Sequence, residues 1–410
     1  MSTPERSQSG AFFMDVTQRI IHSVDTDISS LESLLAQPAD IIMVFASPTF
    51  FRQPALLNAL SRHTAPVIGC STSGEIAGAD ALEDTAVVTA INLAGAGSTS
   101  IYTDSVEDGD YQGCGKRVGT ALNGDALRAV LLLTRGIDFL PTGMLNGIHE
   151  ILGEQVLLCG GMAGDNATYT RTFVLTPEGI SDHKVVAVGF YGENLCVQQA
   201  IIKGWQPFGP IRQVTRSVNN ILYELDGKPA LDIYKKYLGD YAGQLPMSGL
   251  LFPLELMNSH DETSGLLRAL YSIDESDGSL VLGGKIKQGA YLRLNHASTN
   301  DLISDVEDAA ALFSESVNLP QNSDEHSNRI QNTSGMKPGF ALVVSCVARK
   351  VVMGDQVEEE VEALSGAFSH EVPTCGFYSN GEFGPKTSNG ACKLHNQTMI
   401  VTLFGENGDA

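Results

Sequence analysis

Positive charge and long apolar runs are scarce in this sequence, and each shortage argues against a class of function. The 410 residues include 26 Lys and Arg against 48 Asp and Glu, which gives a net charge of -22 at pH 7. A field of this sign repels phosphate backbones and anionic lipid surfaces, so neither nucleic acid nor membrane is expected as a partner. No apolar run approaches the ~20 residues that a membrane-spanning helix needs.

Signals for secretion and for disulfide bonding are also lacking. The first residues, Met1–Ala11, are polar and do not show the basic-then-apolar pattern of a signal peptide. The 7 cysteines are scattered, odd in number and without a Cys-x-x-Cys pair. Reduced thiols in a cytoplasm fit this usage better than a disulfide framework or a structural zinc site. The expected location is therefore cytoplasmic.

A strand–helix–strand pattern occurs near each end of the chain. Near the start, apolar runs and helical spacing predict a first helix, a buried strand, a second helix and two further strands: Ile20–Ala36, Asp40–Ser47, Pro54–Arg62, Pro66–Cys70 and Thr85–Leu93. Near the end, the same order of strand, amphipathic helix, strand and strand is predicted: Gly339–Cys346, Gln356–Phe368, Pro373–Phe377 and Thr398–Phe404.

The two segments share a string as well as an order of elements. Pro66-x-x-Gly69-x-x-x-x-Gly74-Glu75-Ile76 aligns without a gap against Pro373-x-x-Gly376-x-x-x-x-Gly381-Glu382-Phe383. In both copies the Gly-Glu pair is expected in a loop after the short second strand. The match indicates an internal duplication.

A looser third copy lies between them. Its predicted strand, helix, strand, loop and strand are Ala129–Thr134, Pro141–Leu152, Gln155–Cys159, Gly160–Asp165 and Lys184–Tyr191. This loop is one residue shorter and carries Asp in place of Glu. Repeated units of this kind predict an α/β fold in which mixed sheets are covered by helices and form two lobes.

The middle of the chain contains the predicted joint, between about Gly204 and Pro246. Asp226-Gly227 is typical of a tight turn, and a helix is expected over Pro229–Leu238. A further amphipathic helix is predicted over Asp301–Val317. The polar segment 318–337 is expected to be a mobile surface loop.

Five strings carry a resemblance to a known family: Ile68–Ile76 (IGCSTSGEI), Gly160–Asp165 (GGMAGD), Val214–Tyr234, Gly376–Phe383 (GFYSNGEF) and His395–Thr398 (HNQT). In these strings and their order the chain resembles the FIST-domain proteins. The resemblance implies a FIST N-terminal domain over residues 20–215 and a FIST C-terminal domain over residues 216–404.

The resemblance also implies a function. The family is regarded as a group of intracellular modules that sense small ligands and are linked to signalling enzymes. One branch binds haem, senses nitric oxide and controls a histidine kinase, so haem b and such a kinase are the most specific expectations. A sensor of an amino acid or another small metabolite, without haem, is the alternative. Either form would signal through a separate partner.

The repeat loops are the candidate ligand-binding sites. Glycines allow a positive φ and leave backbone N–H groups free, and a nearby carboxylate could accept hydrogen bonds from a ligand. The candidates are Gly74, Glu75, Gly160, Gly161, Asp165, Tyr378, Gly381, Glu382, His395 and Asn396. The alternative is that Gly-Glu is a turn at a strand end, in which the glutamate caps neighbouring backbone.

Candidate haem ligands follow from the resemblance alone. No Cys-x-x-Cys-His attachment signal is present, so a haem would be bound non-covalently through an axial side chain. His149 lies on a predicted helix among Leu145, Ile148 and Ile151, and His395 begins the last predicted strand. The alternative for both is a structural histidine.

An enzyme is the least favoured interpretation. Gly69-Cys70-Ser71-Thr72-Ser73 resembles the Gly-x-Ser-x-Gly nucleophile elbow except at its last position. Cys70 or Ser71 could then act on a small acyl or amino compound. A buried strand cysteine is the more frequent explanation.

Overall fold

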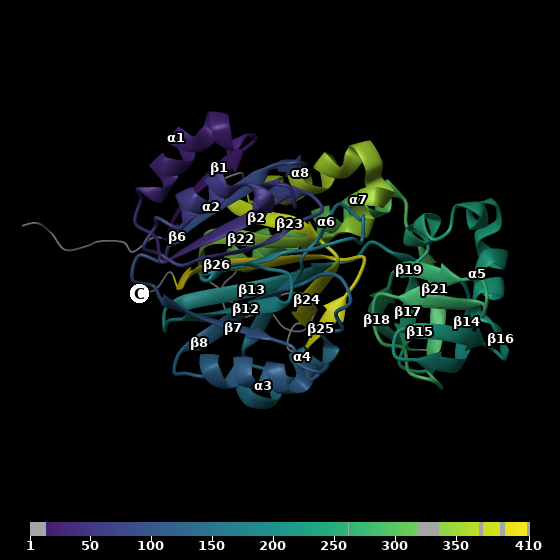
Figure 1. The fold of residues 1–410 in the computed structure, drawn as a ribbon. Coiled ribbons are helices and arrows are strands. Elements are labelled where there is room, and N and C mark those ends of the chain that lie inside the picture. Colours follow the sequence, from purple (N-terminus) through teal and green to yellow (C-terminus); the bar gives the residue numbers. More distant parts are fainter. Residues whose placement is uncertain (1–13, 261, 319–335, 369–371, 386–389, 408–410) are drawn as a thin grey trace, which may run out of the picture.

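The computed structural model describes residues 14–260, 262–318, 336–368, 372–385 and 390–407. It shows a large α/β body and a smaller, β-rich lobe beside it (Figure 1). The predicted α/β class is therefore confirmed. Most of the predicted surface loop, residues 319–335, lies outside the described residues.

The large body contains three six-stranded sheets built on one plan. Two parallel strands occupy the centre of each sheet, and they are largely buried because apolar and small residues make up most of their sequences. The central pairs are β2 (Ile41–Ala46) with β3 (Val67–Ser71), β8 (Leu127–Thr134) with β9 (Leu157–Met162), and β22 (Met336–Cys346) with β23 (Thr374–Ser379). All six coincide with apolar segments that the sequence predicts as strands.

Each central pair is flanked by an antiparallel strand and then by an edge strand. The flanking strands are β6 (Ala86–Asn92), β12 (Lys184–Tyr191) and β26 (Met399–Asn407), and the edge strands are β1 (Asp15–Ile21), β7 (Ser98–Ser105) and β13 (Leu195–Ile202). The looser middle copy is thus as complete as the other two, and the body consists of three equivalent units.

Helices connect the strands of each unit. They are α1 (Val24–Leu35) and α2 (Pro54–Leu60) in the first unit, α3 (Tyr111–Leu122) and α4 (Thr142–Leu152) in the second, and α6 (Thr299–Asn318), α7 (Val347–Met353) and α8 (Val357–Ala367) in the third. Short 3-10 turns add η1 (Phe50–Arg52) and η4 (Gly354–Gln356). Among the helices of the described ranges, none is long and apolar enough to cross a membrane.

A short hairpin follows each repeat loop and joins the sheet of a different unit. The hairpins are β4 (Glu75–Ala77) with β5 (Asp80–Leu82), β10 (Val174–Thr176) with β11 (Gly179–Ser181), and β24 (Gly381–Pro385) with β25 (Cys392–His395). β4 pairs with β23 of the third unit, β10 with β3 of the first, and β24 with β9 of the second. The exchange is cyclic and locks the three units together.

Three local predictions were wrong. Gly160, Gly161 and Met162 were expected in a loop, yet they form the end of strand β9. The predicted first helix from Ile20 begins only at Val24, because Ile20 and Ile21 complete strand β1 and pair with Val87 and Ala86 of β6. The Gly-Glu pairs were expected in loops, yet Glu75 begins β4 and Gly381-Glu382 begins β24. Their strand partners come from other units, which no local pattern reveals.

The smaller lobe is an insertion in the third unit, between β13 and α6 (Figure 1). Its elements are β14 (Gln206–Val218), β15 (Ile221–Leu225), β16 (Lys228–Pro229), α5 (Ala230–Leu238), η2 (Gly239–Gln244), η3 (Met247–Leu251), β17 (Leu254–Met257), β18 (Thr263–Arg268), β19 (Leu270–Asp274), β20 (Ser279–Leu282) and β21 (Tyr291–His296). The strands form one sheet around a separate apolar core that includes Leu222, Tyr234 and Leu280.

Arg349 fixes both connections between the body and the inserted lobe. Its guanidinium donates to Lys203 O at 2.6 Å and to Leu302 O at 3.4 Å, on either side of the insertion. It also forms an ion pair with Glu360 at 2.5 Å, and both side chains are fully buried. Asp305 accepts hydrogen bonds from the backbone N–H groups of Lys203 and Gly204. The lobe is therefore held at its base by a buried charge network.

Replacing Arg349 tests this network. Arg349→Met leaves the buried Glu360 carboxylate without its partner, so the free energy of unfolding is expected to fall by about 3–5 kcal/mol. Equilibrium urea unfolding followed by the fluorescence of Trp205, the 1 tryptophan of the chain, measures the change. The matched control is R349M/E360L, which removes both charges and should recover most of the loss. If R349M unfolds at the same urea midpoint as wild type, the Arg349 network does not stabilise the protein as inferred.

Candidate functional site

The three repeat loops meet at one buried point in the large body. Ser73 N donates to Tyr378 O and Tyr378 N to Gly74 O, each at 2.8 Å. Gly164 N donates to Ser71 O at 2.8 Å, and Asn380 N to Met162 O at 3.3 Å. Each loop is thus hydrogen-bonded to the other two. We call this point the loop junction.

Glu75 and Glu382 occupy equivalent places in the first and third units. Glu382 accepts from Ser379 Oγ at 2.7 Å through Oε1, and from Thr398 Oγ1 at 2.8 Å and Thr398 N at 3.3 Å through Oε2. Glu75 likewise accepts from the hydroxyl of Thr72, from Thr85 Oγ1 at 2.6 Å and from Thr85 N at 3.1 Å. The duplication has kept each carboxyl group together with its hydroxyl and backbone partners.

Burial changes the ionisation of these two carboxyl groups. It raises the pKa of Glu75 to about 7 and the pKa of Glu382 to about 8, although the hydrogen bonds from the hydroxyls oppose the rise. The Lys350 ammonium also favours the charged form of Glu75. Glu382 is therefore mostly protonated at neutral pH, and its neighbourhood carries little negative charge.

Asp165, the acidic residue of the second repeat loop, binds backbone N–H groups of the segment that follows it. Its Oδ2 accepts from Thr170 N at 2.7 Å and from Arg171 N at 3.1 Å, and its Oδ1 accepts from Tyr169 N at 3.1 Å. The side chain therefore holds the loop that leads to β10. Gly160 lies within β9 at φ +107, and a Cβ there would meet Leu132 O at 2.2 Å. Close packing of strands explains this glycine.

A cavity of about 550 Å³ lies between the body and the inserted lobe. The body contributes residues 136–140, Met162 and Tyr169 to its lining, and the lobe contributes Asn220, Tyr271, Ser272 and residues 281–283. The Tyr271 hydroxyl donates to Asn380 O at 2.7 Å, and the rings of Tyr169 and Tyr271 lie 5.6 Å apart. Asn380 belongs to the third repeat loop, so the loop junction reaches the wall of this cavity.

Several buried polar atoms near this wall have no hydrogen-bond partner in the described part of the chain. They are both side-chain amide atoms of Asn396, Asn380 Oδ1, Gln397 Oε1 and Arg268 Nε. Unpaired buried polar groups are rare in proteins, and a bound ligand is one way to satisfy them. These residues do not line the cavity themselves, but Asn380 hydrogen-bonds to the lining residues Gly136 and Tyr271, and Asn396 packs against the lining residue Gly283. Within the described ranges, no lining residue of a second hollow of about 560 Å³, between α2 and the β10–β11 hairpin, hydrogen-bonds to them. The interlobe cavity is therefore the candidate ligand site.

Two family models match successive parts of the chain: the FIST N domain over residues 40–228 and the FIST C domain over residues 230–385. The chain belongs to the FIST family. FIST domains are associated with signal transduction and with the sensing of small ligands.

Two proteins similar to this FIST protein have names that state no function. A protein of Mycobacterium tuberculosis is 24% identical over 356 residues, which cover 83% of this chain and 84% of the relative. A protein of Methanocaldococcus jannaschii is 31% identical over 103 residues, and the match spans 24% of this chain and 20% of that relative. A solved structure of PurLQS from Thermotoga maritima aligns at 9% identity over 76% of this chain and 73% of its own, with a TM-score of 0.19. A similarity at that level carries no argument.

The structure brings most of the predicted ligand residues of this FIST protein to the loop junction. Gly74, Glu75, Tyr378, Gly381 and Glu382 surround it, and Gly161 contacts it, since a Cβ on Gly161 would lie 2.8 Å from Gly381 O. His395 and Asn396 lie beside Thr398, a partner of Glu382. The side chains of the five non-glycine residues are enclosed by protein. The part of all these residues in ligand binding stays a prediction.

The residues that sequence reasoning missed come mainly from the inserted lobe. Tyr271 and Arg268 approach the junction only through the folding of the lobe onto the body. One signal was visible: Arg268 interrupts the apolar run Leu266-Leu267-Arg268-Ala269-Leu270. A charged residue in such a run is costly to bury unless it is paired or binds something.

The two candidate haem ligands differ in how their ring nitrogens are used, and their part in haem binding stays a prediction. His149 Nε2 accepts from Cys392 N at 2.7 Å, and its Nδ1 donates to Gly153 O at 3.1 Å, so both ring nitrogens are occupied. His395 Nε2 contacts Gly384 O at 3.1 Å, whereas its Nδ1 has no hydrogen-bond partner among the described residues. Burial lowers the pKa of His395 to about 3, which keeps the ring neutral. Neither side chain lines the interlobe cavity. Among the described residues, no group of three or more His, Cys, Asp and Glu could hold a metal ion.

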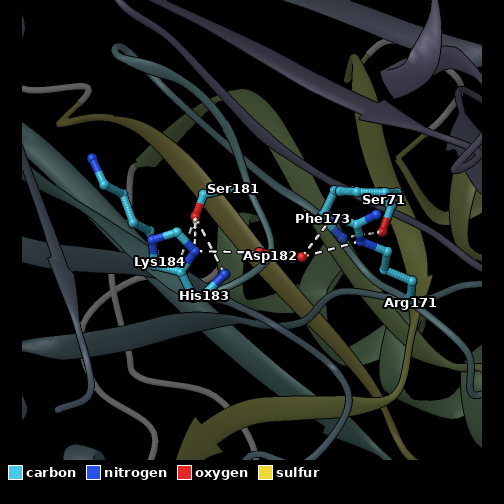
Figure 2. A network of polar contacts seen from close by, with 7 residues as sticks. All are labelled: Ser71, Arg171, Phe173, Ser181, Asp182, His183 and Lys184. Atoms are coloured by element: carbon cyan, nitrogen blue, oxygen red, sulfur yellow. Dashed lines mark hydrogen bonds and ion pairs between the residues drawn. The ribbon is translucent and has the colours of Figure 1, made fainter.

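The candidate nucleophiles are held by structural contacts. Figure 2 shows Ser71 Oγ accepting from Phe173 N at 2.8 Å, and the same hydroxyl donates to Gly164 O at 2.8 Å. Nearby, the side chains of Ser181 and Asp182 both contact Nδ1 of His183, which differs from a triad, where they would use opposite ring nitrogens. Burial raises the pKa of the Cys70 thiol well above its usual range, which keeps it protonated and unreactive.

The raised pKa of Glu382 predicts a pH-dependent stability. Between the unfolded-state pKa near 4.3 and about 8 the folded protein binds more protons, so stability falls as pH rises by up to about 1.4 kcal/mol per pH unit. Glu382→Gln keeps the shape of the protonated carboxyl group but cannot ionise. It therefore removes the contribution of Glu382 to the pH dependence of stability, and the urea midpoint of the variant should change less between pH 5 and 8. Exposed Glu154→Gln is the control and should keep the wild-type slope. An unchanged slope in E382Q would show that Glu382 does not titrate in this range.

The burial of the thiols predicts their reactivity. Six cysteines are buried and Cys196 alone is partly exposed. A thiol reagent should therefore label at most one site in the folded protein and all 7 in denaturant. Cys196→Ser should abolish the fast label, as mass spectrometry of the intact protein can check. Rapid labelling of Cys70 in the folded state would revive the enzyme interpretation.

Proposed function

We propose that this FIST protein is a sensor that binds a small ligand in the interlobe cavity and reports its presence to a separate signalling partner. The observation that carries the proposal is the cavity itself, because buried and unpaired polar atoms of Asn380 and Asn396 lie directly behind its lining residues Gly136 and Gly283. A cavity between two lobes with a few converging polar groups is the usual form of a small-molecule site.

The position of the cavity suggests how binding could become a signal. Ile137 and Phe139 line it from the body, and Asn220 and Ser272 line it from the lobe. A ligand that contacts both sides stabilises the arrangement in which they lie close together. The buried Arg349 network at the base of the lobe gives a fixed pivot about which the lobe can move relative to the body. Ligand binding then shifts the lobe relative to the body.

The lobe also offers a surface for the partner. Phe208, Tyr241, Met247 and Val218 are large apolar side chains of the lobe that are between 42% and 56% exposed. Exposed apolar side chains often mark sites of protein association. A two-component histidine kinase or another signalling enzyme remains the proposed partner, on the resemblance to the family.

A ligand other than haem is the preferred form of the proposal. His149 and His395 lie outside the cavity lining, and the ring nitrogens of His149 are occupied. Haem b and nitric oxide stay predictions from the family resemblance. A small metabolite is favoured because the unpaired polar atoms behind the lining belong to amides and a guanidinium, which recognise polar ligand groups by hydrogen bonds.

The experiment first identifies what the protein carries. Molecules released from natively purified protein are identified by mass spectrometry and titrated back by calorimetry. Ser272→Trp fills part of the cavity and should weaken binding at least tenfold, because the indole ring occupies space that the ligand needs. Ser276→Trp, on an exposed turn of the same lobe, is the matched control and should bind normally.

Three outcomes would count against the proposal or its form. Equal binding by S272W would move the ligand out of the cavity. The absence of any released molecule and of any ligand-dependent stabilisation would remove the sensor interpretation. A stoichiometric Soret band after reconstitution with haem would restore the haem form.

A further inference from the structure

Arg268 is a buried guanidinium without a counter-ion among the described residues. It lies at the end of β18 with 5% of its surface exposed. Its Nη1 donates to Leu267 O at 2.8 Å and to Leu394 O at 3.2 Å, while its Nε has no partner. Arg349 is equally buried but forms an ion pair with Glu360. Burial lowers the pKa of Arg268 to about 10, as expected where no carboxylate compensates the charge.

Two adjacent glycines make room for Arg268 and Asn396 next to the cavity. Gly283 lines the cavity, and a Cβ there would lie 2.5 Å from Asn396 Oδ1. A Cβ on Gly284 would lie 2.7 Å from Arg268 Nε. Any side chain at these positions would push the amide or the guanidinium away. The glycine pair therefore lets the Asn396 amide and the Arg268 guanidinium pack directly behind the cavity lining.

The charges around this point favour an anion over a cation. Glu382 is mostly protonated at neutral pH, and its oxygens are bound by Ser379 and Thr398. The imidazole of His395 is neutral, because burial lowers its pKa to about 3. Among the lining residues in the described part of the chain, the one carboxylate is that of Asp138, which is exposed.

A second guanidinium stands on the body side of the cavity. Arg135 lies 5.6 Å from the ring centroid of Phe139, a lining residue, and its Nη2 donates to Asp138 O at 3.0 Å. Its Nε also lacks a partner. Positive charge therefore approaches the cavity from the body as well as from the lobe.

We propose that the ligand of the interlobe cavity is a small organic carboxylate. Its carboxylate accepts hydrogen bonds from Arg268 and from the amide of Asn396, and its apolar part packs against Tyr169 and Tyr271. A guanidinium and a carboxylate match in both charge and planar shape. The inference rests on the proposed function, that the cavity holds a ligand, and adds the chemical class of that ligand.

A structural role and a binding role for Arg268 predict opposite changes in stability. Removing a buried charge that has no counter-ion among the described residues offsets the loss of its hydrogen bonds to Leu267 O and Leu394 O, so the apo protein is expected to be as stable as wild type or more stable. Arg268→Met should therefore keep or raise the melting temperature without ligand and lose carboxylate binding. A structural guanidinium would instead lower the melting temperature when removed.

The test uses the full chain and matched probes. Butyrate and benzoate are titrated by calorimetry and thermal shift, with butylamine, benzamide and inorganic phosphate as comparison probes. Wild-type protein should bind the carboxylates in preference to the amine, the amide and phosphate. Arg268→Met should weaken carboxylate binding by about 30-fold or more, and Arg268→Lys should retain part of it. Arg216→Met, an exposed arginine of the same lobe that pairs with Glu224, is the control and should bind as wild type does.

The outcomes separate this inference from the proposed function. Carboxylate binding that survives in R268M, or tighter binding of the amine or of phosphate, overturns the carboxylate assignment. The same holds if the molecule released from native protein contains no carboxylate. In those cases loss of that molecule's binding in S272W still supports the sensor. If no probe and no released molecule binds wild-type protein, both proposals fail.

Discussion

The repeat loops meet where no solvent reaches, so every backbone and carboxyl group there needs a partner from the protein itself. The loops supply these partners to one another, as when Ser73 N donates to Tyr378 O and Gly164 N to Ser71 O. Glu75 and Glu382 add bonds to hydroxyls of their own units. The position of the cavity follows from this arrangement, because Asn380 links the junction to Tyr271 of the lobe.

Much of the large body could be predicted from the sequence. Strand β2 is apolar throughout and β22 is mainly apolar from Phe340 onward, and the repeated Gly-Glu string relates the units that contain them. The exchanged hairpins could not be predicted, because a three-residue strand such as β10 has no periodicity and its partner lies in another unit. The strand β1, Asp15–Ile21, reads DVTQRII, and its apolar end was easily assigned to the helix that follows.

Only part of the candidate site could be predicted from the sequence, because its residues come together from distant parts of the chain. The repeated string pointed to Glu75 and Glu382, but a sequence cannot distinguish a carboxyl group that caps its own unit from one that contacts a ligand. Here the hydrogen bonds to Thr85 and Thr398 give the repeated glutamates a structural role, which is sufficient to explain why both copies have one. The cavity itself forms between segments more than a hundred residues apart, such as Phe139 and Ser272, and no spacing along the chain encodes it.

The cyclic exchange of hairpins makes the chain indivisible. The two family models meet between residues 228 and 230, which suggests a natural place to divide it. A chain ending there would lack β24, β23 and β26, so β9 would lose one neighbour, β4 would have no sheet to join, and β13 would stand alone. Open edges of this kind pair with other chains and aggregate. The family is therefore described by two domain models, whereas the three units of the body are joined by their exchanged hairpins and are expected to fold together. A fragment that ends between the two models would be expected to precipitate rather than to fold.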